Sequence, residues 1–140
     1  MYYCNMYSLE TKIRVRYAET DQMSFVYYGI YAQYYEVGRV ELLRSMGLSY
    51  KVIEDMGYTL PVVKMNINYK KPAFYDDELI IRTTIKKLPT AKITFDYETF
   101  NNAGDLLNFG EVILVFVKKE TGKPCYAPEF IINKFKENIR

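Results

Sequence analysis

Apolar and polar residues alternate along the first part of the chain and again along most of its second half. Between Leu9 and Tyr17, Ile13 and Val15 are separated by charged residues, and this period of two predicts a strand with one buried face. Similar patterns, each bounded by turn residues, predict four later strands, at 63–69, 79–85, 93–99 and 112–117. The last of these is continuously apolar, which is typical of a central strand buried on both faces.

Between the first strand and the others, the period changes to that of a helix. From Ile30 to Met46, apolar residues recur every three or four positions, which predicts one long helix with an apolar face. Gly38 in its middle costs about 1 kcal/mol relative to alanine, so we expect this residue to lie in close contact with a sheet. Gly47 is well placed to end the helix.

Two shorter helical segments complete the pattern, at 49–56 and from Pro128 onward. The order of elements predicts an α+β domain in which the long helix lies on one face of an antiparallel sheet. The sequence contains no linker, internal repeat or low-complexity segment. Residues 1–140 are therefore expected to form one domain.

Composition narrows the classes of function. The net charge of +2, from 19 basic and 17 acidic residues, argues against a nucleic-acid-binding protein that relies on bulk positive charge. No stretch approaches the roughly 18 apolar residues of a membrane span, and the first seven residues lack the features of a signal peptide. The two cysteines, Cys4 and Cys125, have no metal-binding spacing, so we expect free thiols in a reducing compartment, the cytoplasm.

The chain contains no histidine. Ser-His-Asp and Cys-His catalysis are therefore excluded, as are zinc sites that need imidazole, and we expect neither a metal nor a cofactor. If the protein is an enzyme, its acid–base chemistry falls to carboxylates, tyrosine, lysine, water or backbone dipoles.

The connection from Ala18 to Tyr28 is too long for a tight turn, and loops of this kind often carry functional residues. It holds Asp21 shortly before the long helix, whose first backbone N–H groups suit a developing negative charge. Gly29 has no side chain that would cap or cover those groups. Taken alone, a loop aspartate more often caps a helix or stabilises a turn, and Gly29 is equally suited to a plain turn.

Residues 19–44 read E-T-D-Q-M-S-F-V-Y-Y-G-I-Y-A-Q-Y-Y-E-V-G-R-V-E-L-L-R and resemble the motif of the hotdog-fold acyl-CoA thioesterases. They are most similar to the 4-hydroxybenzoyl-CoA thioesterase and YbgC-like branch, whose pattern is D-T-D-x-x-G-V-V-Y-H-x-x-Y-x-x-x-F-E-x-A-R-x-E-x-L-R. In this register Asp21 matches the catalytic aspartate of the family, and Tyr31 matches its later tyrosine. The chain departs from the pattern at Ser24, where the family has glycine, and at Tyr28, where many members have histidine.

The resemblance covers roughly residues 9–120 and implies a hotdog fold, in which a curved antiparallel sheet wraps a long central helix. It implies hydrolysis of an acyl-CoA, with coenzyme A as part of the substrate. Asp21 would act as general base on water or as nucleophile, and backbone N–H groups of Tyr28, Gly29 and Tyr31 would polarise the carbonyl. The family also implies a homo-oligomer, a dimer or a tetramer, with sites between protomers.

Coenzyme A carries phosphates, which call for basic residues at the mouth of the pocket. The candidates are Lys70, Lys71, Lys86 and Lys87. Two other functions stay open at this point. One is a non-catalytic module that binds acyl-CoA without turnover, and the other is a hydrolase for acyl groups on a carrier protein.

Other residues of the motif have simpler interpretations. The rings of Tyr28 and Tyr31 could form only the wall of a pocket. Glu36 could be a second catalytic carboxylate, but its spacing of three residues from Arg39 favours a surface ion pair on the helix.

Overall fold

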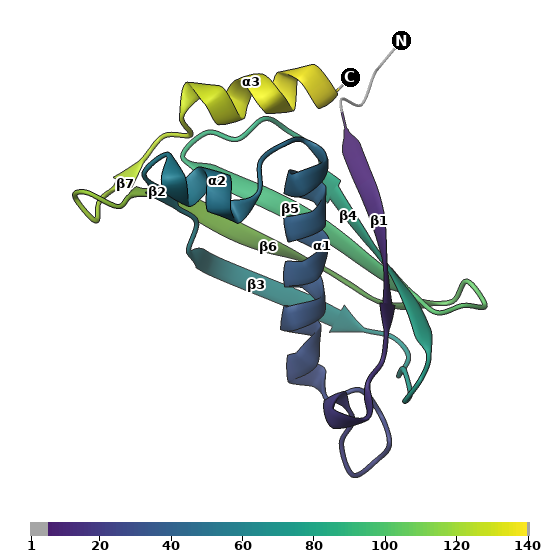
Figure 1. Ribbon diagram of the computed structural model, residues 1–140. Helices are drawn as coiled ribbons and strands as arrows, with labels where there is room; N and C mark the ends of the chain where they lie inside the picture. The colour runs from purple at the N-terminus through teal and green to yellow at the C-terminus, as the bar shows by residue number, and fades with distance from the viewer. Residues whose placement is uncertain (1–5, 140) are drawn as a thin grey trace.

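The computed structural model of the chain describes residues 6–139 and places a long helix across one face of an antiparallel sheet that curves around it (Figure 1). The strands are β1 (Tyr7–Arg14), β2 (Tyr58–Thr59), β3 (Val62–Tyr69), β4 (Glu78–Ile85), β5 (Lys92–Phe100), β6 (Leu106–Lys118) and β7 (Pro124–Cys125). The helices are α1 (Tyr31–Ser45), α2 (Tyr50–Asp55) and α3 (Glu129–Asn138), with single 3₁₀ turns η1 (Tyr17–Glu19) and η2 (Tyr28–Ile30). This arrangement confirms the α+β prediction and the wrapped helix that the resemblance implies.

The sheet is antiparallel throughout, with strand order β1-β4-β5-β6-β2, and β3 and β7 also pair with β6. Each of the five strands predicted from sequence is present, with ends that differ from the prediction. The short strands β2 and β7 were not predicted, because two residues are too few to show a period.

Strand β6 differs from its prediction in length and in burial. It begins at Leu106 rather than at residue 112, because the residues before the apolar run continue the ladder with β5. Val112, Leu114 and Phe116 are fully buried, whereas the residues between them are only half-buried. The prediction of a strand buried on both faces was therefore wrong, since only one face lies in the core.

The apolar stripe predicted for the long helix is the face of α1 that lies in the core. The ring of Tyr35 stacks on that of Tyr97 in β5, with ring centroids 4.1 Å apart. Gly38 lies against β4, where a Cβ atom on this residue would come within 2.4 Å of Thr83 Oγ1. The expected close contact between Gly38 and the sheet is therefore confirmed. The buried residues of the stripe are Tyr31, Tyr34, Tyr35, Gly38, Leu42 and Met46.

Arg39 was expected on the exposed face of the helix, and this expectation was wrong. Its side chain is only 7% exposed, because Tyr50 at the start of α2 lies close to it and accepts a hydrogen bond from Arg39 Nε at 2.9 Å. The expected partner Glu36 is present, with 3.9 Å between Arg39 Nη2 and Glu36 Oε2. Helix α2 thus converts a surface ion pair into a half-buried one, which helix periodicity alone does not reveal.

The ends of the helices follow the predicted signals. Gly47 has a left-handed backbone, with φ of 81°, directly after α1, and α3 forms after Pro128 as expected. Among residues 6–139, no helix is long and apolar enough to cross a membrane. Cys125 is a free thiol, and Cys4 lies outside the described residues.

Candidate active site

The loop between β1 and α1 is closed on itself by backbone hydrogen bonds. The Tyr27 N–H donates to the Glu19 carbonyl at 2.9 Å, and the Asp21 N–H donates to the Phe25 carbonyl at 2.8 Å. These bonds bring the two ends of the loop together, so that Asp21 lies in a compact turn rather than on an extended connection. Figure 1 shows this loop at the amino end of α1.

One oxygen of the Asp21 carboxylate is held by the loop itself. Its Oδ1 accepts the N–H groups of Met23 at 2.9 Å and of Phe25 at 3.3 Å. Within residues 6–139, Oδ2 makes no hydrogen bond or ion pair, and the residue is exposed. The carboxylate is therefore oriented through one oxygen, while the other is free to accept a proton or to attack.

Ser24 has the left-handed backbone that the family's glycine would supply, with φ of 68°. Its N–H donates to the Asp21 carbonyl at 3.0 Å, which closes the turn. A non-glycine residue in this region costs about 1–2 kcal/mol. At the position where the family pattern has glycine, Ser24 therefore adopts the backbone conformation that glycine favours.

The helix begins with a 3₁₀ turn rather than with a plain α-helical turn. The Ile30 N–H donates to the Tyr27 carbonyl at 2.9 Å, and the Tyr31 N–H donates to the Tyr28 carbonyl. Of the N–H groups predicted to polarise a carbonyl, that of Tyr31 is therefore already used. In the described part of the chain, those of Tyr28 and Gly29 make no hydrogen bond.

Gly29 does not have a left-handed backbone, so a turn requirement does not explain this glycine. A Cβ atom at this position would lie 2.8 Å from Cε2 of the Tyr27 ring. The ring of Tyr27 in turn lies 4.6 Å from that of Tyr28, measured between centroids. The absence of a side chain at Gly29 thus lets two aromatic rings pack beside the free N–H groups.

A cavity of about 330 Å³ lies beside the loop and the start of the helix. It brings together Asp21, Tyr28, Tyr31, Lys70 and Lys71, which the sequence analysis had selected for different reasons. Gly29 does not line it. The lining residues are Asp21, Phe25, Val26, Tyr28, Tyr31, Tyr69, Lys70, Lys71 and Pro72.

Tyr31 and Tyr69 of this cavity are hydrogen-bond donors at neutral pH. Burial raises the pKa of Tyr31 to about 12, with smaller contributions from Tyr69 and Asp77. Burial also raises the pKa of Tyr69, whose hydroxyl donates to the Tyr28 carbonyl at 3.3 Å. Tyr31 is almost fully buried and Tyr28 is largely exposed, so the two rings form the inner and outer walls.

The four candidate lysines fall into two separate places. Lys70 lies over the Phe109 ring, 5.6 Å from its centroid, and Lys71 Nζ lies 3.7 Å from Asp105 Oδ1, both at the Asp21 cavity. Lys86 and Lys87 instead line a different cavity with Leu88, Lys136 and Ile139.

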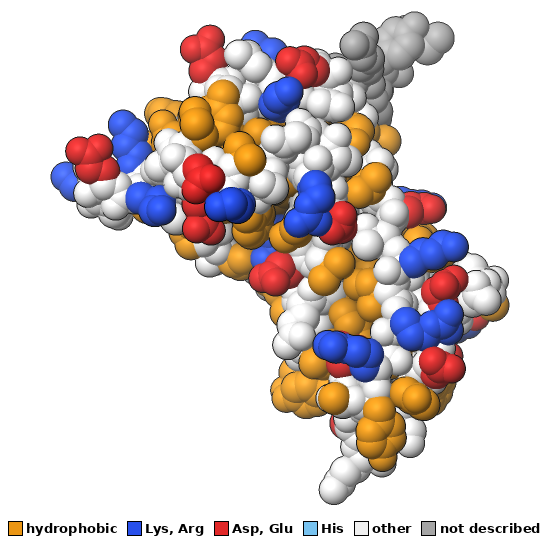
Figure 2. All heavy atoms as spheres, viewed as in Figure 1, with side chains coloured by type: hydrophobic (Ala, Val, Ile, Leu, Met, Phe, Trp, Pro, Cys, Tyr) orange, Lys and Arg blue, Asp and Glu red, His pale blue; other side chains and the backbone are white. Residues whose placement is uncertain are grey.

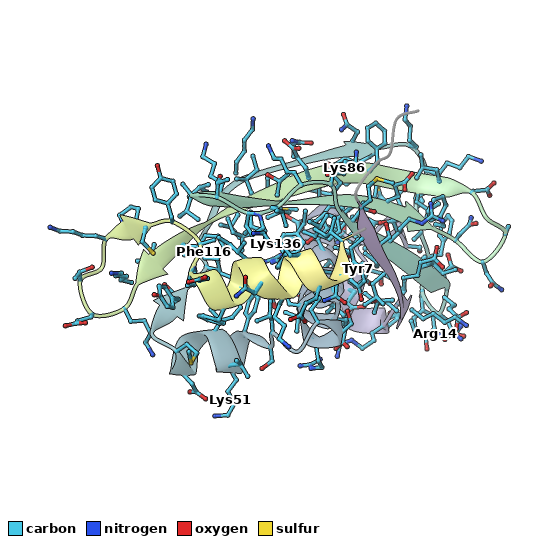
Figure 3. The ribbon with its side chains drawn as sticks, turned by 90° about the horizontal axis from the view of Figure 1, so that it is seen from above. Tyr7, Arg14, Lys51, Lys86, Phe116 and Lys136 are labelled. Carbon is cyan, nitrogen blue, oxygen red and sulfur yellow. The ribbon has the colours of Figure 1, made fainter. Side chains whose placement is uncertain are left out.

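The distance between these two places follows from the register of β1. Tyr7 pairs with Ile85, the neighbour of Lys86, whereas Arg14 at the other end leads into the Asp21 loop. Eight strand residues span roughly 25 Å. Figure 3, which looks down on the α3 end, labels Lys86 and Lys136 there. Within one protomer, Lys86 and Lys87 therefore do not face Asp21.

Glu19 is the residue of this region that the sequence analysis missed. It is only 7% exposed, and its Oε1 accepts the Arg16 N–H at 2.9 Å and the Tyr34 hydroxyl at 2.8 Å. Its Oε2 accepts from Arg16 Nε at 3.0 Å and Nη2 at 2.9 Å. An acidic residue in a loop is usually exposed, so the sequence gives no signal for the burial of Glu19. The acidic residue at the same position of the family pattern, two residues before Asp21, is the one feature that could have drawn attention to it.

These contacts keep Glu19 ionised. Burial alone would raise the pKa of its carboxyl, but the hydrogen bonds from Arg16 and Tyr34, together with the charge of Arg16, lower it below its ordinary value. Glu36, by contrast, is exposed and does not line the Asp21 cavity.

Apolar side chains also gather on the surface around the site. Figure 2 shows them at the end of the molecule where the loop lies. The exposed aromatic residues in this region are Tyr17, Tyr27, Tyr28, Phe74 and Tyr75. A cluster of exposed aromatic residues of this kind marks a surface that is suited to contact with a ligand or another chain.

Comparison with known proteins identifies relatives of the whole domain. Residues 15–135 match the model of the thioesterase-like superfamily. The chain is 39% identical to YneP of Bacillus subtilis (strain 168), over 85% of this chain and 86% of YneP. It is 34% identical to the acyl-CoA thioester hydrolase YbgC of Escherichia coli O6:H1, over 89% of this chain and 93% of YbgC.

A solved structure gives the same result. The DHNA-CoA thioesterase from Staphylococcus aureus superposes with a TM-score of 0.81 at 37% sequence identity, covering 85% of this chain and 80% of that one. Similarity at this level confirms the resemblance drawn from residues 19–44.

Proposed function

The chain belongs to the thioesterase-like superfamily, and we propose that within it the protein hydrolyses the thioester of an acyl-CoA to the free acid and CoA. The names of YbgC and of the Staphylococcus aureus enzyme support this substrate class. The observation that carries the proposal is the cavity lined by both Asp21, with one free carboxylate oxygen, and Tyr28, with a free N–H group. The proposed reaction needs neither a metal nor a cofactor.

The start of the helix supports a role in stabilising charge. As the thioester carbonyl is attacked, its oxygen becomes negative, and the N–H groups of Tyr28 and Gly29 are free to donate to it. The dipole of α1 adds a favourable field at this end. Removing one such donor typically costs about 10²–10³ in rate.

Asp21 then has two possible routes. As general base, Oδ2 takes a proton from water while the water oxygen bonds to the carbonyl carbon; the C–S bond breaks, and the departing CoA thiolate receives the proton. As nucleophile, Oδ2 bonds to the carbonyl carbon directly and CoA leaves, after which water hydrolyses the mixed anhydride. Both routes use the oxygen that the loop leaves free, and the bonds to Oδ1 keep it oriented.

The lysines of the cavity are suited to the anionic part of the substrate. Lys70 and Lys71 line the cavity and project from the end of β3, so they could bind the phosphates of CoA. Lys71 already pairs with the half-exposed Asp105, and that contact is weak enough to be exchanged for a phosphate.

Thiol release from a panel of acyl-CoAs tests the proposed function. We expect turnover with at least one aliphatic or aryl acyl-CoA. Binding by calorimetry without thiol release would instead favour a non-catalytic acyl-CoA-binding module. Competition between acyl-CoA and the same acyl group on a carrier protein distinguishes the third function, a carrier-protein thioesterase.

The edge of the sheet supports a homo-oligomer, as a dimer or a tetramer. Among the described strands, β3 pairs only with β6, so one edge of this eight-residue strand is unpaired. Val62, Val63 and Tyr69 on this strand are about half exposed. Light scattering should give at least twice the 16.6 kDa chain mass, and a stable monomer would contradict this part of the proposal.

The protein is also proposed to act in the cytoplasm. The proposed acyl-CoA substrate and the free thiol of Cys125 support a reducing compartment. Fractionation of cells that produce the protein tests this location directly.

A further inference from the structure

Glu19 is unusual among the charged residues near the site because it is buried. Burying a carboxylate costs several kcal/mol unless hydrogen bonds and an opposite charge compensate. Here Arg16 supplies the charge and Tyr34 supplies a hydroxyl from the first turn of α1. The side chain of Glu19 therefore connects η1, the turn that follows β1, to α1.

The backbone of Glu19 makes a second connection, to the other end of the loop. Its carbonyl accepts the N–H of Tyr27, the residue directly before the free N–H groups of Tyr28 and Gly29. Asp21 lies two residues along the chain in the other direction. Glu19 is thus linked to Asp21, to the segment that carries the N–H groups of Tyr28 and Gly29, and to α1.

The rate of such a reaction depends on the distances between the catalytic groups. A displacement of about 1 Å can cost on the order of 10²-fold in rate. Asp21 is exposed, and within residues 6–139 the only bonds to its carboxylate come from its own loop. The placement of the whole loop on α1 therefore has to come from other contacts. The bond between Tyr34 and Glu19 supplies such a link.

We propose that Glu19 is a positioning residue for the reaction proposed above, and that its bond to Tyr34 holds Asp21 and the N–H groups of Tyr28 and Gly29 in register with α1. The proposal rests on the proposed function, since it assigns Glu19 a part in that same site. Glu19 does not line the cavity and so does not touch the substrate.

The test compares Tyr34→Phe with the matched variant Tyr35→Phe. Both residues are buried neighbours on α1, and each hydroxyl donates to one buried acceptor, Glu19 for Tyr34 and Asn108 for Tyr35 at 2.6 Å. Each substitution therefore removes one buried hydrogen bond, and the loss of stability is larger for Tyr34→Phe because its acceptor is ionised. Only Tyr34 bonds to the loop that carries Asp21.

We expect Tyr34→Phe to lower kcat about tenfold or more with KM changed less than twofold, and Tyr35→Phe to leave kcat within twofold of wild type. Glu19→Ala, which loses both the bond to Tyr34 and the charge that pairs with Arg16, should lower kcat further than Tyr34→Phe. An unchanged kcat in Tyr34→Phe, or an equal loss in Tyr35→Phe, would overturn the proposal.

Amide hydrogen exchange at Tyr27 gives a readout that needs no turnover. Its N–H donates to Glu19, so we expect exchange at least tenfold faster in Tyr34→Phe and unchanged exchange in Tyr35→Phe. If wild type hydrolyses no thioester, the proposed function fails, and this exchange still decides whether the bond to Tyr34 holds the loop. Exchange at the wild-type rate in Tyr34→Phe would then count against it.

Discussion

Gly38 of α1 and Thr83 of β4 are packed so closely that a Cβ atom on residue 38 would lie 2.4 Å from Thr83 Oγ1. This contact sets how near the helix lies to the sheet. It also explains why a residue of poor helix propensity stands in the middle of the longest helix.

Gly38→Ala should therefore destabilise the protein, although alanine is the better helix former by about 1 kcal/mol. The added methyl group forces the helix and β4 apart, and overpacking of this kind costs typically 1–3 kcal/mol. Urea unfolding measures the change. Val37→Ala, on the exposed neighbour, is the control and should shift stability by less than about 0.5 kcal/mol. A more stable Gly38→Ala protein would contradict the described packing.

Ser24→Gly should stabilise the protein by roughly 0.5–1 kcal/mol. Ser24 has φ of 68°, which glycine adopts without steric cost, and part of the gain is lost to the greater freedom of glycine in the unfolded chain. Thermal unfolding measures the difference. Ser24→Ala keeps the strain and should show no gain, so equal stabilisation by both variants would argue against the left-handed loop.

The stability that Glu19 contributes should depend on pH in a defined direction. Its folded-state pKa is lowered, because hydrogen bonds and the charge of Arg16 outweigh burial, so its contribution is fully present above the ordinary pKa of 4.5. The contribution is lost as pH falls through the lowered pKa. The difference in unfolding free energy between wild type and Glu19→Gln should therefore be largest at pH 7 and should shrink progressively as the pH falls below 4.5. A difference that grows toward low pH would contradict this assignment.

Lys70→Ala should raise KM for an acyl-CoA about fivefold and leave kcat nearly unchanged. The residue is proposed to bind phosphate, and an exposed charge-assisted contact is worth about 1 kcal/mol. Steady-state kinetics measures both constants. With a short thioester that lacks the phosphates, Lys70→Ala should have the same KM as wild type. The control variant Lys51→Ala should have the wild-type KM for the acyl-CoA, because Lys51 lies on α2 and is exposed (Figure 3). An equal loss of kcat/KM with the acyl-CoA and with the short thioester would show that Lys70 has another role.

Local sequence pattern was sufficient for most of the fold. Alternation in β4 and β5 and the stripe on α1 each reflect one buried face, and such a face is visible in the order of residues. The motif around Asp21 likewise identified the family, which the comparisons confirmed. What the pattern could not give was contact between distant segments.

The burial of Arg39, the burial of Glu19 and the distance between Lys86 and Lys70 were not evident from the sequence for this same reason. Arg39 is buried because Tyr50 in α2 folds over it, and Glu19 is buried because Tyr34 and Arg16 bond to it. A charged residue gives no sequence signal for burial when its partners come from other elements. Lys86 was grouped with Lys70 by charge alone, yet the register of β1 with β4 places it at the opposite end of the molecule.

The kcat of Asp21→Asn tests the central claim most directly. Asparagine keeps an oxygen that can accept the N–H groups of Met23 and Phe25, so the loop should hold its shape while the free oxygen loses its basicity. On an acyl-CoA that the wild type cleaves, we predict a fall in kcat on the order of 10²-fold or more, with KM and the thermal midpoint close to wild type. Hydrolysis at the wild-type rate by Asp21→Asn would contradict the account.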